Sequence, residues 1–378
     1  MKKSIVLITL LLICICFALC GCSSLSSKTY SSFDYFSTVV TFNALSDSSS
    51  NSAQAWEDMQ VSLAAMEGKL SSYVDGSDID KFNKAAPSTT IEISKMTYEV
   101  LSMAKDIYQN TNGAYNPAMF LLSDLWGFTD RCITSYTPTK PYDRADFTKE
   151  LPNETYINGF LSLSDYSQVT LSEDEGKYYV FKPALTWSDG TDTYTMQLDL
   201  GGIVKGYASA YLKDSAINNK VSYGYVSLGS SSIVMLGRSE KGADWDLKLK
   251  DPKDANNYYL SIPTKNAFVS TSGNYEQYYE IDGRRYCHII NPYTGYPIDN
   301  TTLSTSCIMP FSDDYIKQAT YSDALSTALI VMDLNSAIKY LKDNAILGSI
   351  AVNVNGNYKV FTNIKNAKIL GNYGAYEG

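Results

Sequence analysis

Three small groups of residues have the types and spacing that acid–base catalysis, cation binding and anion binding require. The single histidine of the chain, His288, lies within the patterned stretch from Ala267 to Pro297, and imidazole is the usual general acid or base near neutral pH. Asp323 and Thr327 are four apart, so on a helix their oxygens share one face and suit a hard cation such as Mg²⁺. Gly201-Gly202 precedes a predicted helix with Lys205 in its first turn, an arrangement whose backbone N–H groups favour an anion.

Each group also has a purely structural interpretation, and spacing alone leaves both open. His288 could make one hydrogen bond at a strand end. Asp323 could favour a helix N-terminus while Thr327 bonds back to the backbone. The glycine pair could serve helix packing, because one Gly-Gly turn is weak evidence for a phosphate site.

The elements that must position these residues follow from hydrophobic periodicity and turn signals. Strands and helices alternate without strict βαβ order, which predicts an α+β or irregular α/β fold with mixed sheets and flanking helices. The predicted elements are a strand at 35–42, a helix with a stripe from Trp56 to Leu70, a strand at 91–93, a helix capped by Ser94, a strand at 196–200, a helix from Val204, a hairpin around Asp282-Gly283, a helix capped by Ser322 and a hairpin around Asn355-Gly356.

Composition excludes several classes of protein. The 378 residues are 44% hydrophobic and 19% charged, which is ordinary for a globular chain, and the formal charge of −9 argues against a nucleic-acid binder. No CxxC pair exists, so a zinc site is not expected, and Cys287 and Cys307 are predicted to be small buried hydrophobic residues. A solute-capturing lipoprotein would need paired parallel α/β lobes, which the order of elements does not suggest.

The N-terminus is predicted to be a targeting segment. Lys2 and Lys3 precede an apolar run, and Leu19-Cys20-Gly21-Cys22 resembles a bacterial lipoprotein cleavage site. Residues 1–21 are therefore predicted to be a lipoprotein signal peptide and Cys22 the lipidated first residue, which would anchor an exported protein to the extracytoplasmic face of a membrane. Residues 22–32 would form a Ser-rich tether. A plain secretory signal and an uncleaved anchor remain alternatives.

Several motifs, in this order, resemble one family, the ApbE-type FAD:protein FMN transferases. The resemblance covers residues 33–363 and leaves 364–378 as a C-terminal tail. The motifs are Tyr35-Phe-Ser-Thr-Val39, Ser77-Asp-Ile-Asp-Lys-Phe-Asn83, Thr111-Asn-Gly-Ala-Tyr-Asn-Pro117, Leu198-Asp-Leu-Gly-Gly-Ile-Val-Lys-Gly-Tyr207, Val269-Ser-Thr-Ser-Gly-Asn-Tyr275, His288-Ile-Ile-Asn-Pro-Tyr-Thr-Gly-Tyr-Pro297 and Ser322-Asp-Ala-Leu-Ser-Thr-Ala328.

The resemblance implies a two-lobed, T-fold-reminiscent body with FAD in a central cleft. It implies a Mg²⁺-dependent reaction that splits the FAD pyrophosphate, attaches FMN to a Thr or Ser of an exported acceptor protein and releases AMP. FAD hydrolysis to FMN and AMP, or non-catalytic flavin binding, are the alternatives. The implied site residues are His288 and Lys205 as catalytic groups, Asp323, Thr327 and the Val204 carbonyl as metal ligands, and Tyr115, Gly201, Gly202, Ser270, Thr271, Ser272, Gly273 and His288 around the cofactor.

Two positions depart from the family pattern. Asn291 stands where relatives commonly have Asp, which would lower activity if that carboxylate orients the histidine. Ser230 stands where relatives often have Gly, which puts a close backbone contact in doubt.

Overall fold

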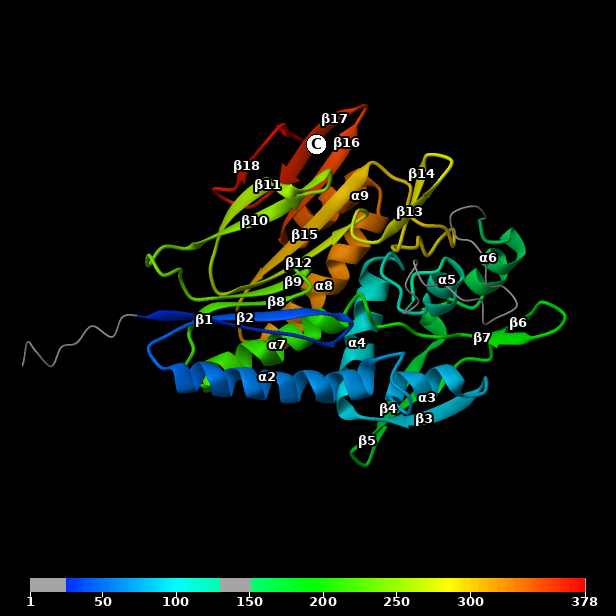
Figure 1. Ribbon diagram of the computed structural model, residues 1–378. Coiled ribbons are helices and arrows are strands. Elements are labelled where there is room, and N and C mark those ends of the chain that lie inside the picture. Colours follow the sequence, from blue (N-terminus) through cyan, green and yellow to red (C-terminus); the bar gives the residue numbers. More distant parts are fainter. Residues whose placement is uncertain (1–24, 130–150, 378) are drawn as a thin grey trace, which may run out of the picture.

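The computed structural model describes residues 25–129 and 151–377 (Figure 1). The predicted signal peptide, the lipidation residue Cys22 and Cys132 lie outside these residues. In the part of the chain that is described, none of the helices has the length and apolar character needed to span a bilayer.

One nine-stranded sheet forms the centre of the molecule. Its neighbouring strands pair antiparallel, except that the last pair, β17 with β19, is parallel. In spatial order the strands are β1 (Ser26–Tyr35), β2 (Thr38–Ser46), β8 (Tyr223–Leu228), β9 (Ser232–Leu236), β12 (Ala267–Gly273), β15 (Thr302–Pro310), β16 (Leu347–Val354), β17 (Asn357–Thr362) and β19 (Gly374–Ala375).

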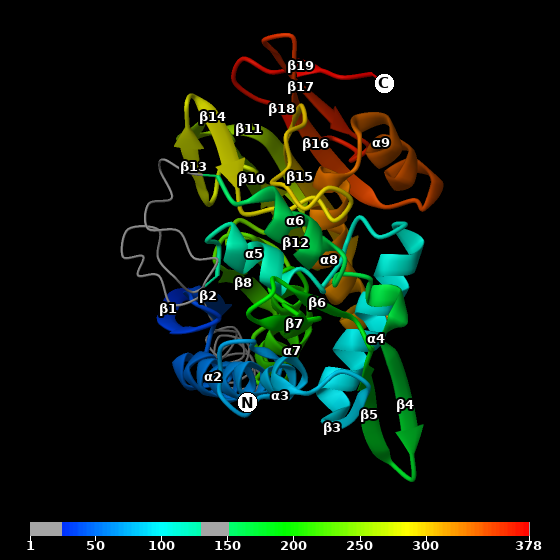
Figure 2. The same ribbon diagram turned by 90° about the vertical axis from the view of Figure 1, so that its right-hand side faces the viewer.

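Helices cover one face of this sheet and a small sheet covers the other (Figures 1 and 2). The helices are α2 (Ser49–Leu70), α4 (Lys95–Asn110), α7 (Val204–Asn218), α8 (Tyr315–Val331) and α9 (Leu334–Asp343). The small sheet contains β10 (Trp245–Asp251), β11 (Asp254–Thr264) and β18 (Lys368–Ile369). Val269 packs with Leu260 and Ile262 under the small sheet, whereas its neighbour Phe268 packs on the helical side, as strand alternation requires.

The remaining elements surround the end of the sheet at which the predicted site residues lie. The elements beside α2 and α4 are α3 (Asp78–Lys84), η2 (Tyr166–Gln168), β3 (Thr89–Ile93), β4 (Thr170–Asp174) and β5 (Lys177–Lys182). The others are α5 (Phe120–Leu125), α6 (Glu154–Leu161), β6 (Thr186–Ser188), β7 (Thr193–Thr195), β13 (Tyr278–Ile281) and β14 (Arg284–Cys287). Trp126, Phe160, Tyr279 and Tyr286 form a separate aromatic core among this second group.

Most of the predicted elements are confirmed. The mixed α+β fold is present, Ser94 caps α4 by accepting the Thr97 N–H, and both predicted hairpins form around Asp282-Gly283 and Asn355-Gly356. Cys287 and Cys307 are free and buried, as expected for small hydrophobic residues.

Residues 26–32 and the described residues after 363 are more ordered than predicted. Residues 26–32 are not a flexible tether, because they belong to β1, which pairs with β2 along its length. The tail from residue 364 contains β18 and β19, which pair with β11 and β17. Serine and threonine side chains pair well across strands, so a Ser-rich composition did not exclude an edge strand.

Two local predictions are wrong. Ser322 does not begin a helix: α8 starts seven residues earlier at Tyr315, and the buried Ser322 hydroxyl donates back to the Ala319 carbonyl at 2.8 Å. Residues 196–200 alternate in burial as predicted but form no strand. The backbone of Leu198 bonds instead to the side chain of Asn83, and Asp199 N–H donates to the Pro117 carbonyl.

The docking of β1 can be tested with a matched aromatic pair on that strand. Tyr30 stacks between Phe42 and Trp56, with ring centroids 6.1 and 5.9 Å away, whereas Phe33 is 75% exposed. Tyr30→Ala should lower the free energy of unfolding by about 1–2 kcal/mol, and Phe33→Ala by less than about 0.5 kcal/mol, in denaturant titrations. Equal effects of the two changes would mean that this segment is the loose tether after all.

Candidate functional site

The site is built where the first turn of α7 meets the middle of α8. A side chain on Gly206 is impossible, because an added Cβ would lie 2.4 Å from the Ala319 carbonyl oxygen and 2.6 Å from Cβ of Asp323. The Gly206 N–H donates to Oδ2 of Asp323 at 2.9 Å, and Asp323 is only 4% exposed. A carboxylate from α8 therefore caps the N-terminus of α7, which has no cap from its own residues.

Oxygen atoms gather around this contact. Thr327 lies one turn beyond Asp323, and its hydroxyl is 3.1 Å from that of Ser272 on β12. A Cβ added to Gly202 would lie 3.6 Å from the Thr327 hydroxyl and 3.5 Å from the ring of Tyr115. The structure thus brings together Asp323, Thr327, Ser272, Gly202 and Tyr115, all predicted from the sequence.

The hydroxyl of Tyr115 is a buried polar atom that has no partner among the described residues. Burial raises the pKa of this hydroxyl well above 10, and the nearby charges of Tyr166, Asp323 and Asp199 raise it further. A neutral hydroxyl near two carboxylates, with no hydrogen-bond partner among the described residues, is the kind of group that a bound ligand or ion would satisfy.

Asp199 and Lys205 form the charged edge of the site. Asp199 accepts the Gly201 N–H at 2.9 Å, and burial raises its pKa, partly offset by that bond and by the charge of Lys205. The Lys205 ammonium donates back to the Gly201 carbonyl at 3.0 Å. Asp199 was not predicted as a site residue. Its position, two residues before Gly201, was the available signal.

His288 follows β14 and faces the aromatic side of the hairpin, 6.5 Å from the ring of Phe128. Its Nδ1 lies 3.3 Å from the Gln277 carbonyl, which can only accept, so the proton is on Nδ1 and Nε2 is left with a lone pair. Burial lowers the pKa of His288 to about 4; the Gln277 bond opposes the shift and Lys205 adds to it. His288 is therefore a neutral imidazole at pH 7.

The predicted segment 270–273 divides between two faces of β12. Ser270 and Ser272 face α8: Ser270 bonds to Ser322 at 2.9 Å, and Ser272 reaches Thr327. Thr271 points to the opposite face and bonds to Ser306 on β15. Only Ser272 is therefore beside the predicted metal ligands, while Ser270 supports the base of the site.

Asn83 holds the segment that leads into the Gly-Gly turn. This residue ends the motif at 77–83, but no role was predicted for it. Its amide donates to the Leu198 carbonyl at 2.9 Å and its Oδ1 accepts the Leu198 N–H at 2.7 Å. The side chain thus replaces a strand partner. No local pattern signals this contact, because the two residues are 115 positions apart.

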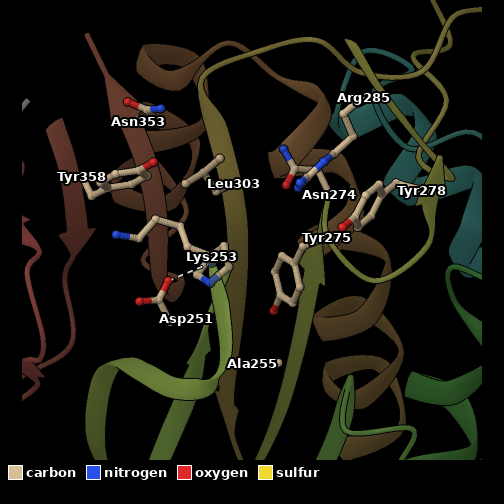
Figure 3. Close-up of a pocket in the computed structure, with 11 residues that line it drawn as sticks. Asp251, Lys253, Ala255, Asn274, Tyr275, Tyr278, Arg285, Leu303, Asn353 and Tyr358 are labelled. Atoms are coloured by element: carbon tan, nitrogen blue, oxygen red, sulfur yellow. Dashed lines mark hydrogen bonds between the residues drawn. The ribbon is translucent and has the colours of Figure 1, made fainter. Parts of the chain in front are cut away.

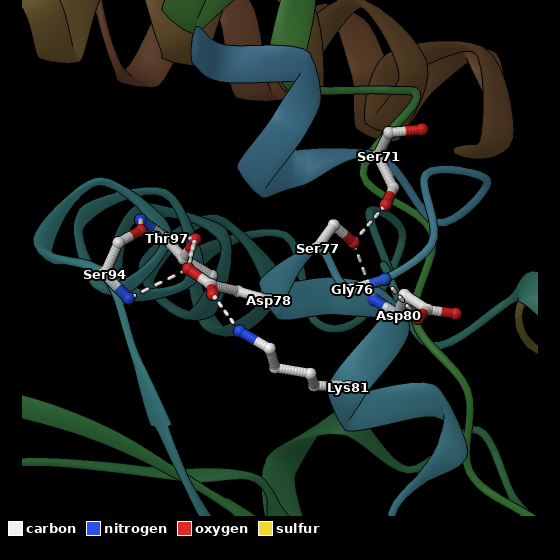
Figure 4. Close-up of polar contacts among 8 residues, drawn as sticks. All are labelled: Ser71, Gly76, Ser77, Asp78, Asp80, Lys81, Ser94 and Thr97. Atoms are coloured by element: carbon white, nitrogen blue, oxygen red, sulfur yellow. Dashed lines mark hydrogen bonds and ion pairs between the residues drawn. The ribbon is translucent and has the colours of Figure 1, made fainter.

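Helix α3, which carries Asn83, is fixed at both ends. At its start, the Ser77 hydroxyl accepts the Asp80 N–H, and the buried Asp78 carboxylate accepts bonds from Ser94 and Thr97 on α4 (Figure 4). At its end, the fully buried Lys182 donates to the Phe82 and Asn83 carbonyls, both at 3.0 Å. Burial lowers the pKa of Lys182 to about 8.

The site residues fit a hard cation. Within residues 25–129 and 151–377, no three His, Cys, Asp or Glu side chains lie close enough together to hold a metal ion. A metal ion here would therefore be held by hydroxyl and backbone carbonyl oxygens as well as by carboxylate. Oxygen ligands are the ones that Mg²⁺ prefers. The carboxylate of Asp323 accepts one bond on each oxygen and keeps further lone pairs. The carbonyl of Val204, the first residue of α7, lies along the helix axis and is the least available predicted ligand.

Comparison with known proteins identifies the family of the chain. The model of the ApbE family matches residues 36–350. The chain belongs to the ApbE family.

Several relatives are named FAD:protein FMN transferase. The FAD:protein FMN transferases of Escherichia coli K12 and Treponema pallidum are each 27% identical to this chain, over 282 and 298 residues. These matches cover 74% and 76% of this chain and 72% and 74% of the relatives. Among solved structures, the flavin transferase ApbE from Vibrio cholerae has a TM-score of 0.72 at 21% identity, covering 89% of this chain and 97% of its own. The ApbE protein from Thermotoga maritima has a TM-score of 0.71 at 26% identity, covering 86% and 94%.

The two departures from the ApbE family pattern have structural roles here. Oδ1 of Asn291 accepts the Tyr293 N–H at 2.9 Å, closing a turn that an Asp oxygen would close equally well. Ser230 adopts a left-handed backbone with φ of 60°, next to Gly229 with φ of 62°, in the turn from β8 to β9. Serine is tolerated there at a cost of about 1 kcal/mol relative to glycine.

Because the chain has one histidine, its titration can be followed without assignment. The imidazole proton resonance in NMR should titrate with a midpoint near pH 4 rather than 6.5, since burial disfavours the charged ring. The folded-state pKa is the lower one, so His288 contributes stability above pH 6.5 that is lost as pH falls toward 4. A midpoint above 6 would show an exposed histidine and contradict this site.

Asn83→Leu tests the link between α3 and the Gly-Gly turn. The change leaves the buried Leu198 N–H and carbonyl without partners, which should cost about 2–4 kcal/mol of unfolding free energy. Turnover of FAD by the remaining folded protein should fall roughly tenfold, because Asp199 and the turn lose their support. Asn335→Leu, at an exposed position on α9, is the control. If both variants behave like the wild type, Asn83 does not position the site.

Proposed function

We propose that this protein is an FAD:protein FMN transferase, which moves FMN from FAD to a Thr or Ser hydroxyl of an acceptor protein and releases AMP. The observation that carries the proposal is the cluster of Asp323, Thr327, Ser272 and the unpartnered Tyr115 hydroxyl at the N-terminus of α7. Membership of the ApbE family and the names of its relatives support the same function.

The reaction exchanges one phosphorus–oxygen bond for another. The acceptor hydroxyl oxygen attacks the phosphorus of the FMN half, the bond from that phosphorus to the bridging oxygen breaks, and AMP leaves with that oxygen. The hydroxyl proton must be removed. His288 is the candidate acceptor, since its ring is neutral and its Nε2 has no hydrogen bond to a residue that the structure describes. A pKa near 4 makes it a weak base, so positioning the hydroxyl is a second role that the same geometry serves.

The residues around the phosphates would divide their work. Lys205 contributes one positive charge, and the Gly201-Gly202 turn with the N-terminus of α7 contributes backbone donors. Asp323 and Thr327 would hold Mg²⁺, with the Val204 carbonyl as the third proposed ligand. The ion, when bound, supplies charge neutralisation for the diphosphate and the leaving AMP.

The N-terminal sequence is the basis of a proposal on localisation. We propose that the protein is exported and anchored by lipid on Cys22, at the extracytoplasmic face of a membrane, where it would meet an exported acceptor. The apolar run after Lys2 and Lys3 and the Leu-Cys-Gly-Cys stretch support this proposal.

Release of AMP from FAD tests the function and the metal assignment together. Asp323→Asn keeps an oxygen for the Gly206 N–H but removes the negative charge, so the fold should survive. With saturating Mg²⁺, its rate of AMP release should fall roughly 10³-fold, since metal catalysis is worth several kcal/mol. Asp343→Asn, at an exposed position on α9, is the control.

The outcomes separate the alternatives. AMP released only with an acceptor indicates a transferase, whose acceptor gains the mass of one FMN. AMP released without an acceptor indicates a hydrolase, with water in place of the hydroxyl. Wild-type protein that binds FAD but never releases AMP would leave only a flavin-binding role. An Asp323→Asn variant as active as wild type would remove the metal assignment.

A further inference from the structure

Two rows of small polar side chains run along α8 at the proposed metal site. Asp323 and Thr327 form the row that meets α7, where Thr327 lies beside Gly202. Ser322 and Ser326, each one position earlier, face β12 and are 1% and 0% exposed. No role was predicted for this second row. Its hydrogen bonds determine which lone pairs Thr327 can offer to a cation.

Ser326 occupies the carbonyl to which Thr327 could otherwise bond. A threonine inside a helix can donate its proton to the carbonyl four residues back, which for Thr327 is that of Asp323. Here the Ser326 hydroxyl donates to that carbonyl at 2.8 Å. The second lone pair of the carbonyl is used by the backbone N–H of Thr327, as in any helix. The Thr327 hydroxyl lies instead 3.1 Å from that of Ser272 on β12.

Each hydroxyl has a single proton, and this fixes the direction of the bonds around Ser272. The Ser272 hydroxyl is 2.8 Å from that of Ser326 and 3.1 Å from that of Thr327. Ser326 gives its proton to the Asp323 carbonyl, so Ser272 has to donate to Ser326. Ser272 then has no proton left for Thr327, so Thr327 donates to Ser272. Because no described residue donates to the Thr327 oxygen, its lone pairs are available to a cation.

Ser326 is itself fixed from two sides. Its side chain is fully buried between α8 and β12, and its backbone carbonyl accepts the Thr305 hydroxyl of β15 at 2.6 Å. The Asp323 carboxylate is oriented in a similar way. Its Oδ1 accepts the Ser232 hydroxyl at 3.2 Å, and its Oδ2 accepts the Gly206 N–H at 2.9 Å. Both proposed ligands are therefore held by neighbours that orient them, as metal ligands in proteins usually are.

A hollow of about 390 Å³ offers another place where a cation could meet a carboxylate (Figure 3). It lies between the turn from β10 to β11 and the hairpin of β13 and β14, and its carboxylate is Asp251. Asp251 already accepts the Tyr373 hydroxyl at 2.6 Å and the Lys253 N–H at 2.9 Å. The Lys253 ammonium in the same hollow would repel a metal ion. Asp251 is therefore a suitable negative control for Asp323.

We propose that Ser326 is a positioning residue for the cation. It occupies the Asp323 carbonyl and, through Ser272, directs the Thr327 proton toward β12, so that Thr327 presents its lone pairs to Mg²⁺. The inference rests on the metal site of the proposed function, but not on the transfer of FMN. Binding of a cation to the protein alone therefore tests it.

The first measurement is binding of Mn²⁺ to the full chain without FAD, because Mn²⁺ takes the same oxygen ligands as Mg²⁺ and is seen by EPR. The titration should show a saturable site that is lost in Asp323→Asn and unchanged in Asp251→Asn. Ser326→Ala should raise the Kd of this site about tenfold, since Thr327 can then bond back to the unused Asp323 carbonyl. Absence of a saturable site in the wild type, or wild-type affinity in Asp323→Asn or Ser326→Ala, would overturn the inference.

Ser215→Ala is the matched control. Ser215 is 8% exposed on α7 and donates to the Tyr211 carbonyl at 3.0 Å, so the change removes the same kind of bond away from the proposed ligands. It should leave the Mn²⁺ affinity unchanged, and it should shift the thermal midpoint of the metal-free protein about as much as Ser326→Ala does. An equal loss of Mn²⁺ affinity in the two variants would reveal a general loosening of the helices and contradict the positioning role.

A double-mutant cycle separates positioning from a purely structural role of Ser326. Thr327→Val keeps the shape of the side chain but removes its hydroxyl, so it should weaken Mn²⁺ binding at least as much as Ser326→Ala. In the Thr327→Val background, Ser326→Ala should have no further effect on the Kd, because Ser326 acts through the Thr327 hydroxyl. A further loss equal to that of the single variant would show that Ser326 acts in another way.

Release of AMP from FAD keeps this result apart from the proposed function. Ser326→Ala should need about tenfold more Mg²⁺ than the wild type to reach half of its maximal rate. Wild-type protein that binds Mn²⁺ at Asp323 but never releases AMP would count against the transferase and leave the positioning role intact. Wild-type protein that releases AMP, together with an unchanged Mn²⁺ affinity in Ser326→Ala, would overturn the inference and leave the transferase intact.

Discussion

The site depends on one close contact between two helices. Gly206 on α7 touches the backbone of α8 with no space for a side chain, and its N–H is bound by the Asp323 carboxylate. This contact fixes both helices in register, so Thr327 lies beside Gly202 and above Ser272. A residue larger than glycine at position 206 would push the two helices apart. The oxygens of Asp323, Thr327 and Ser272 would then no longer lie close together. The carboxylate that would hold a cation is therefore also the group that holds the helices.

The second support of the site is irregular by necessity. In a regular sheet, the neighbouring strands satisfy the backbone N–H and carbonyl groups of each strand. Residues 196–200 form no strand, because they place Asp199 and the Gly-Gly turn beside α7 and α8. Their backbone is satisfied by Asn83 and Pro117 instead. Lys182 and the Asp78 network hold α3, which places Asn83. Polar side chains from neighbouring elements thus satisfy backbone groups that strand pairing satisfies elsewhere in the fold.

What the sequence could predict was set by the range of each interaction. Asp323 and Thr327 are four residues apart, so helix geometry places them on one face wherever the helix begins. The wrong helix start at Ser322 therefore did not affect the prediction of this pair. The hairpin that carries His288 follows from the local Asp-Gly turn. Strand alternation could have separated Thr271 from Ser270 and Ser272. The Asn83–Leu198 bonds and the pairing of β1 depend on contacts that leave no local pattern.

The charges of the site also explain its need for a partner ion under the proposed function. Asp199 and Asp323 lie near the Tyr115 hydroxyl, which has no partner among the described residues. His288 is neutral, and the Lys205 ammonium donates to the Gly201 carbonyl. A diphosphate approaching these groups alone would meet two carboxylates and one ammonium, in a chain of charge −9. Backbone donors of α7 offset only about half a charge. Under the proposed function, a divalent cation in the oxygen cluster would offset this repulsion, so metal binding and diphosphate binding would strengthen each other.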